Sequence, residues 1–214
     1  MLGKDPRAKK IALVAHCLLN QNARVNGIAS TPAMLVEVVE LLNRYDYGIL
    51  QLPCPETIYA GTRRWWHVKE QFNNIGFINV SKQLLAPIVD QIKEYQEGGF
   101  KVILIGSDGR PSCGVRCTRS NTKWGGRPEL PEDEFSLIPE KGVFIELLLE
   151  MIEKNNLGKV PYTAVGPEED DAEKIVNELE VFLKENQQKR WLAGGPRFLG
   201  ATAGGAGGRG VNLL

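Results

Sequence analysis

The chain has 214 residues, of which 43% are hydrophobic and 24% are charged, and its 26 basic and 26 acidic residues balance to a formal net charge of zero. This length and composition predict a globular protein with one sizeable core, and the zero net charge gives no electrostatic reason to expect a nucleic acid partner. No apolar run approaches the roughly 18–20 residues that cross a membrane, and the N-terminus has no signal-peptide core. We therefore expect a cytoplasmic protein, with no membrane partner, whose four cysteines serve metal binding or catalysis rather than disulfides.

The sequence pattern in the first half of the chain predicts two strands, which are separated by a loop and a helix. Branched apolar residues over 9–17 predict a buried first strand. Asparagines and a glycine mark 18–27 as a loop, and the apolar spacing over 30–48 is typical of a helix. A second strand is predicted over 49–54, and the segment 63–72 after it is less regular.

The second half repeats the alternation of helix and strand. An amphipathic helix is predicted over 81–99, followed by the clearest buried strand of the chain, over 100–108. A further helix over 142–158 precedes a fourth strand over 160–166. The last predicted helix, over 167–189, begins with a proline and four acidic residues, which suit the positive end of a helix dipole.

Strands that alternate with helices predict one α/β domain over residues 8–190. We expect a three-layer sandwich, with a mostly parallel sheet and helices on both faces. Residues 191–214 are rich in glycine and alanine and lack acidic residues, so we predict a disordered tail with no assigned function.

Three of the four cysteines stand at or just after the end of a predicted strand. These are Cys17, Cys54 and Cys113. Because ligands of a parallel sheet gather beyond the carboxyl ends of its strands, the three thiols are expected to converge there. Cys54 lies between two prolines, which fix the backbone and remove amide donors, and a core cysteine needs no such restraint.

Three converging thiolates suit an iron–sulfur cluster better than zinc. Structural zinc sites use four ligands, usually in close pairs such as Cys-x-x-Cys, which this chain lacks. A four-iron cluster tolerates distant ligands because each thiolate binds a different iron, and three thiolates leave one iron open as a Lewis acid. Cys117 is either a fourth ligand, which would close the cluster, or a core thiol.

Polar residues beside the cysteines are candidates for catalytic or substrate-binding roles. Glu56 is two residues from Cys54 and could act as a general acid or base, or could cap or salt-bridge the next loop. Ser107 and Asp108 end the third strand and could position water or substrate, although Asp also favours turns. His16 is more typical of a structural histidine. The stretch Trp65–His67 could line a pocket for a flat heterocycle or pack as core or lid.

Together these motifs resemble the 2-thiouracil desulfurase family, long catalogued as a bacterial domain of unknown function. The resemblance covers roughly residues 10–155 and rests on HCLLN with ARVNG downstream, LPCPE with GTRR downstream, and RPSCG. It implies a [4Fe–4S] cluster held by Cys17, Cys54 and Cys113, with Glu56 as the acid/base residue. It also implies that sulfur is removed from a thiocarbonyl by water without net redox change.

The chain differs from the family pattern at several positions. Asn20 and Asn26 replace a glycine and an aspartate, TRR lacks the family's proline, and Asp108 replaces a serine. The predicted function is therefore a desulfurase, or desulfidase, acting on a thiolated small molecule such as a thio-heterocycle. The alternative is a non-catalytic zinc or closed iron–sulfur protein with a structural or sulfur-carrier role. A nucleotide-binding protein is disfavoured because no glycine-rich phosphate loop follows the first strand.

Overall fold

Four parallel strands form the central sheet. The computed structural model describes residues 5–125, 135–166 and 171–188. β1 (Lys10–Val14) lies between β2 (Gly48–Gln51) and β3 (Lys101–Ser107), and β6 (Tyr162–Val165) pairs with the other side of β3. All three pairings are parallel. After the lysine that begins each of them, the two central strands are mostly branched and small apolar residues, as suits strands that are covered on both faces.

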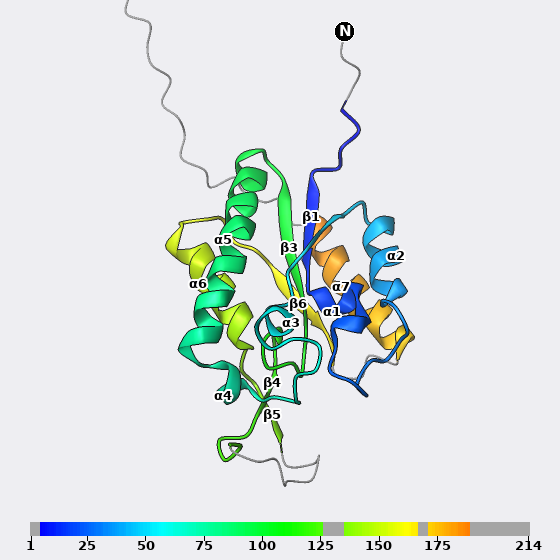
Figure 1. Ribbon diagram of the computed structural model, residues 1–214. Coiled ribbons are helices and arrows are strands. Elements are labelled where there is room, and N and C mark those ends of the chain that lie inside the picture. The colour runs from blue at the N-terminus through cyan, green and yellow to red at the C-terminus, as the bar shows by residue number, and fades with distance from the viewer. Residues whose placement is uncertain (1–4, 126–134, 167–170, 189–214) are drawn as a thin grey trace, which may run out of the picture.

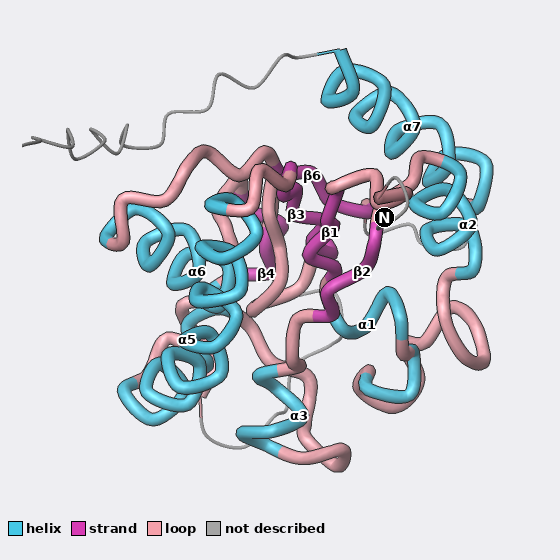
Figure 2. The backbone as a smooth tube through the Cα atoms, turned by 90° about the horizontal axis from the view of Figure 1, so that it is seen from above, coloured by secondary structure: helices cyan, strands magenta, loops and turns pink. Residues whose placement is uncertain are grey.

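Helices cover both faces of this sheet, which confirms the predicted three-layer α/β fold. On one face α2 (Val36–Arg44) packs against α7 (Ala172–Gln188), and on the other α5 (Ile75–Glu97) packs against α6 (Val143–Lys154) (Figures 1 and 2). One continuous apolar core fills the space between the layers and includes the fully buried Phe144.

Short elements gather beyond the carboxyl ends of the strands (Figure 1). They are α1 (His16–Leu19), the 3-10 helix η1 (Gln21–Ala23), α3 (Pro55–Ala60), α4 (Lys69–Phe72) and the antiparallel pair β4 (Thr118–Ser120) and β5 (Ser136–Ile138). Among these places, the sequence predicts a loop over 18–27 and a less regular segment over 63–72, and it predicts no element for α3, β4 or β5. These short elements build the site described below.

Several predicted boundaries shift for local reasons. The first strand ends at Val14 rather than at 17, because α1 begins at His16. The helix predicted over 81–99 begins six residues earlier, where the Asn74 side chain accepts a hydrogen bond from the Phe77 amide at 2.9 Å. Pro87 therefore lies well inside α5.

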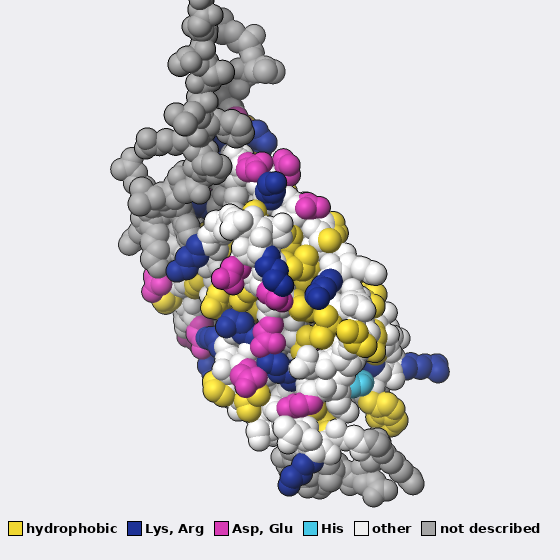
Figure 3. Space-filling view, turned by 90° about the vertical axis from the view of Figure 1, so that its left-hand side faces the viewer, with side chains coloured by type: hydrophobic (Ala, Val, Ile, Leu, Met, Phe, Trp, Pro, Cys, Tyr) yellow, Lys and Arg dark blue, Asp and Glu magenta, His cyan; other side chains and the backbone are white. Residues whose placement is uncertain are grey.

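In the described residues, no helix is both long and apolar enough to cross a membrane. The face over α5 and α6 carries basic and acidic side chains that alternate over short distances, in agreement with the balanced charge (Figure 3). The predicted tail at 191–214 lies outside the described residues.

Candidate functional site

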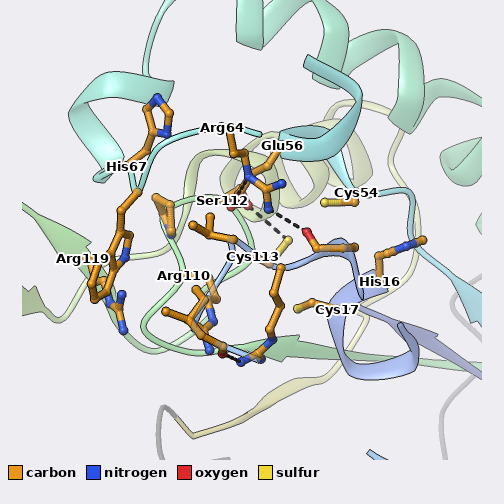
Figure 4. A pocket seen from close by; sticks show the side chains of 16 residues that line it. His16, Cys17, Cys54, Glu56, Arg64, His67, Arg110, Ser112, Cys113 and Arg119 are labelled. Carbon is orange, nitrogen blue, oxygen red and sulfur yellow. Dashed lines mark hydrogen bonds and ion pairs between the residues drawn. The ribbon is translucent and has the colours of Figure 1, made fainter. Parts of the chain in front are cut away.

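The structure brings Cys17, Cys54 and Cys113 to one pocket at the carboxyl edge of the sheet (Figure 4). Cys17 lies in α1 after β1, Cys54 precedes α3 after β2, and Cys113 lies in the loop after β3. Because β1, β2 and β3 are adjacent and parallel, the segments that follow them lie side by side. All four cysteines of the chain are free thiols.

The prolines around Cys54 set the start of α3. Cys54 is the N-cap residue, Pro55 occupies the first turn, and the Cys54 Sγ accepts a hydrogen bond from the Thr57 amide at 3.4 Å. The Thr57 hydroxyl lies 3.2 Å from the same sulfur. Backbone and neighbours thus fix one orientation of this thiol toward the pocket.

The loop that carries Cys113 is pressed against the start of α6. The Phe144 amide donates to the Ser112 carbonyl at 3.1 Å, and the Ser107 amide donates to the Cys113 carbonyl at 3.0 Å. A Cβ at Gly142 would lie 2.4 Å from the carbonyl carbon of Ser112, so only glycine fits there. The position of Cys113 is therefore held by contacts from two separate elements.

Burial and nearby groups raise the pKa of two of these thiols, those of Cys54 and Cys113. Burial raises the pKa of Cys113 well above its ordinary value, and Cys17, Cys54 and Glu56 raise it further. Burial and Glu56 likewise raise the pKa of Cys54, partly offset by hydrogen bonds from Thr57. Cys113 and Cys54 are therefore thiols that a cationic metal centre would stabilise as thiolates.

Glu56 is the carboxylate of the pocket, and both of its oxygens have partners. Arg64 Nε donates to Oε2 at 3.1 Å, and the Ser112 hydroxyl donates to Oε1 at 2.5 Å. The Ser112 oxygen also lies 3.4 Å from Cys113 Sγ. The Arg64 side chain is only 3% exposed and donates to the Ala23 carbonyl at 2.8 Å, which ties Glu56 to the segment after α1.

Asp108 and Ser107 are buried but are not among the residues that line the pocket. Asp108 Oδ1 accepts hydrogen bonds from the amides of Val115 and Arg116, each at 2.9 Å. Its Oδ2 pairs with Arg116 Nε at 2.6 Å. Asp108 therefore closes the loop around Cys113. Its contact with water or substrate stays a prediction.

The remaining sequence candidates divide between the pocket and its surroundings. His16, Trp66 and His67 line the pocket, whereas Cys117 does not and Trp65 is 75% exposed. Burial lowers the pKa of His16, whose ring contacts the side chains of Gln51 and Asn20. The fourth thiol is therefore separate from the other three.

Among the polar residues that line the pocket, sequence reasoning missed Arg110, Ser112 and Arg119. The place of Ser112 near the site could have been predicted, because it directly precedes Cys113 in the RPSCG motif. The sequence around Arg119 does not predict its place in the pocket. Arg119 belongs to a strand of only three residues, which is too short to be predicted from the local sequence.

The arrangement of side chains also bears on the kind of metal centre. In the described part of the chain, no group of three or more His, Cys, Asp or Glu side chains is disposed to hold a single metal ion. A single zinc ion requires its sulfurs at about 2.3 Å from one centre. In a cluster, by contrast, each thiolate binds a different iron rather than one shared ion.

Comparison with known proteins identifies a relative of the chain. It is 41% identical over 109 residues to the uncharacterized protein MJ0003 of Methanocaldococcus jannaschii, an alignment that covers 51% of this chain and 70% of the relative. The chain belongs to the family of this archaeal protein. No protein-family model and no solved structure matches the chain.

Proposed function

We propose that the protein is a non-redox desulfurase, or desulfidase, that removes sulfur from a thiolated small molecule such as a thio-heterocycle. The observation that carries this proposal is the meeting of three cysteines from three different strand ends in one pocket that also holds a buried carboxylate. The resemblance of the surrounding motifs to the 2-thiouracil desulfurase family points the same way.

The three thiols fit a [4Fe–4S] cluster as its protein ligands. Cys17, Cys54 and Cys113 offer only soft sulfur donors, and each comes from a separate segment, as a cluster with a different iron for each thiolate requires. When bound, the cluster would supply an open iron position that acts as a Lewis acid toward sulfur. Free thiols suit a reducing compartment, and we place the protein in the cytoplasm.

The chain's own residues would handle the protons of the reaction. Hydrolysis exchanges the sulfur of a C=S group for the oxygen of water and releases hydrogen sulfide. Glu56 is placed to take a proton from the attacking water and to return it to the departing sulfur. Arg64 and Ser112 each hold one of its oxygens, so the carboxylate keeps one orientation beside Cys113.

The position of Cys117 argues against a closed, four-cysteine centre. Its thiol does not line the pocket, and its backbone carbonyl accepts a hydrogen bond from the Gly109 amide at 3.1 Å within the loop. A non-catalytic structural or carrier protein built on four thiolates would need this sulfur at the centre.

Anaerobic purification with iron and sulfide analysis tests the proposal. We expect about four irons in the wild-type protein, their loss in Cys17→Ala, Cys54→Ala and Cys113→Ala, and full retention in the matched control Cys117→Ala. Sulfide release from a panel of thiolated bases then tests the activity. A centre that requires Cys117, or zinc in place of iron after anaerobic reconstitution, would contradict the proposal.

A further inference from the structure

The sulfurs of the three pocket cysteines differ in the hydrogen bonds that they receive. Cys54 Sγ has two donors from one residue, the Thr57 amide at 3.4 Å and the Thr57 hydroxyl at 3.2 Å. Cys113 Sγ has the Ser112 hydroxyl at 3.4 Å. In the part of the chain that the structure describes, no hydrogen bond reaches Cys17 Sγ. The three proposed ligands therefore have unequal surroundings.

The Ser112 hydroxyl donates to the carboxylate of the pocket rather than to sulfur. A hydroxyl has one proton to donate, and Glu56 Oε1 lies 2.5 Å from Ser112 Oγ, much closer than Cys113 Sγ at 3.4 Å. Sulfur is also the weaker acceptor of the two. Cys54 is therefore the proposed ligand whose hydroxyl partner is available to it.

The Thr57 hydroxyl has a choice of two acceptors. Cys54 Sγ and the Ala23 carbonyl both lie 3.2 Å from Thr57 Oγ1. The Ala23 carbonyl also accepts a hydrogen bond from Arg64 Nη2 at 2.8 Å. When the Thr57 proton turns to the sulfur, this carbonyl keeps a partner, so the turn leaves no buried acceptor unsatisfied.

Arg64 strengthens the Thr57 hydroxyl as a donor. Arg64 Nη1 donates to Thr57 Oγ1 at 3.4 Å, and hydrogen bonds in such a chain polarise one another. The Arg64 side chain is itself buried and is held by Glu56. An ionised sulfur accepts a stronger hydrogen bond than a neutral one. The chain from Arg64 through Thr57 to Cys54 is therefore arranged to stabilise negative charge on this sulfur.

We propose that Thr57 is a positioning residue that acts through the Cys54 thiolate and sets the reduction potential and the retention of the bound cluster. Hydrogen bonds to ligand sulfurs raise the potential, because they stabilise the added negative charge of the reduced state. Thr57 does not line the pocket and so does not touch the substrate. This inference rests on the proposed function, since it requires the [4Fe–4S] cluster proposed there.

Redox titration of the anaerobically reconstituted full-length protein tests the inference, with the electron paramagnetic resonance signal of the reduced cluster as the readout. Thr57→Val keeps the shape and the amide of the residue but removes its hydroxyl. We expect a more negative potential than in the wild type, and about 10-fold weaker retention of iron against a competing chelator. Thr57→Ser, which has the hydroxyl, should return both quantities toward their wild-type values.

Control variants separate this role from a general effect of the substitution. Thr62→Val is the matched control, because Thr62 is exposed and does not line the pocket, and it should change neither the potential nor iron retention. Thr57→Ala also lacks the hydroxyl and takes the place of Thr57→Val if that variant does not fold. The KM for a thiolated probe such as 2-thiouracil should be the same in Thr57→Val and the wild type.

The outcomes separate this inference from the proposed function. An unchanged potential in loaded Thr57→Val, or an equally negative one in Thr57→Ser, would overturn the role of the hydroxyl, even where the protein releases sulfide from thiolated probes. A potential that depends on Thr57, in a loaded protein that releases no sulfide from any probe, would support this role and contradict the desulfurase proposal. A wild-type protein that binds no iron after reconstitution would overturn both.

Discussion

The Ser112 hydroxyl donates a 2.5 Å hydrogen bond to Glu56, a residue 56 positions earlier in the chain. This bond joins the loop after β3 to the first turn of α3. It places the carboxylate and the thiol of Cys113 on one connected unit, because the same hydroxyl lies 3.4 Å from the sulfur. The proposed acid/base group and one proposed metal ligand are therefore positioned together.

Replacing Glu56 should separate proton transfer from metal binding. We expect Glu56→Gln to lower sulfide release by about 10²- to 10⁴-fold, the usual contribution of a general acid or base. Iron content should stay at the wild-type level, because the proposed ligands are untouched. Sulfide release and iron are measured on the same preparation. Wild-type rates in Glu56→Gln would rule out this residue as the acid/base group.

The fold was predictable because its decisive signals are local. The apolar runs of β1 and β3 and the residues that follow them are visible in the sequence, and a parallel sheet brings those segments to one edge. That reasoning places Cys17, Cys54 and Cys113 together without any contact information. It fails at Arg119, whose place in the pocket depends on pairing between β4 and β5 and on contacts with α4.

Asp108 shows a second limit of sequence reasoning. Its place at the end of β3 is correct, but the direction of its side chain follows from Val115 and Arg116, whose amides donate hydrogen bonds to it. Position at a strand end therefore predicts closeness to a site, whereas the side chain's partners decide what it does there.

Gly142 should be intolerant of substitution because of the loop that carries Cys113. An added methyl group would lie 2.4 Å from the Ser112 carbonyl carbon and 2.9 Å from the Cys113 amide nitrogen. We expect Gly142→Ala to lower iron content and sulfide release together, and to cost about 1–3 kcal/mol of unfolding free energy through overpacking. Gly166→Ala is the control, since a Cβ at that position would meet no atom of the described residues within 4 Å. Full iron loading of Gly142→Ala would show that the loop adjusts.

Arg64 should matter for stability as well as for the site. It is buried and donates to Glu56 and to the carbonyls of Ala23 and Gly61. Arg64→Met would leave the Glu56 charge without its partner, so we expect a loss of about 3–5 kcal/mol in unfolding free energy, measured by urea denaturation. Arg63→Gln, at the exposed neighbouring position, should change it by less than about 0.5 kcal/mol. Equal effects of the two variants would contradict this assignment.

Glu70 should make the attachment of the β4–β5 pair sensitive to acid. Burial favours its neutral form, but hydrogen bonds from the Ser120 hydroxyl and the Asn121 amide outweigh this and hold the pKa of Glu70 below its ordinary value. A carboxyl with a lowered folded-state pKa contributes stability that is present above its unfolded pKa of about 4.3 and is lost as the pH falls through the folded value. The free energy of unfolding should therefore decrease on acidification, and Glu70→Gln should remove part of that decrease. Urea denaturation at neutral pH and at about pH 3–4 measures the difference, with the exposed Glu97→Gln as the control. If Glu70→Gln retains the whole acid dependence of the wild type, the bonds to Ser120 and Asn121 do not carry it, and the hairpin that positions Arg119 is held by other contacts.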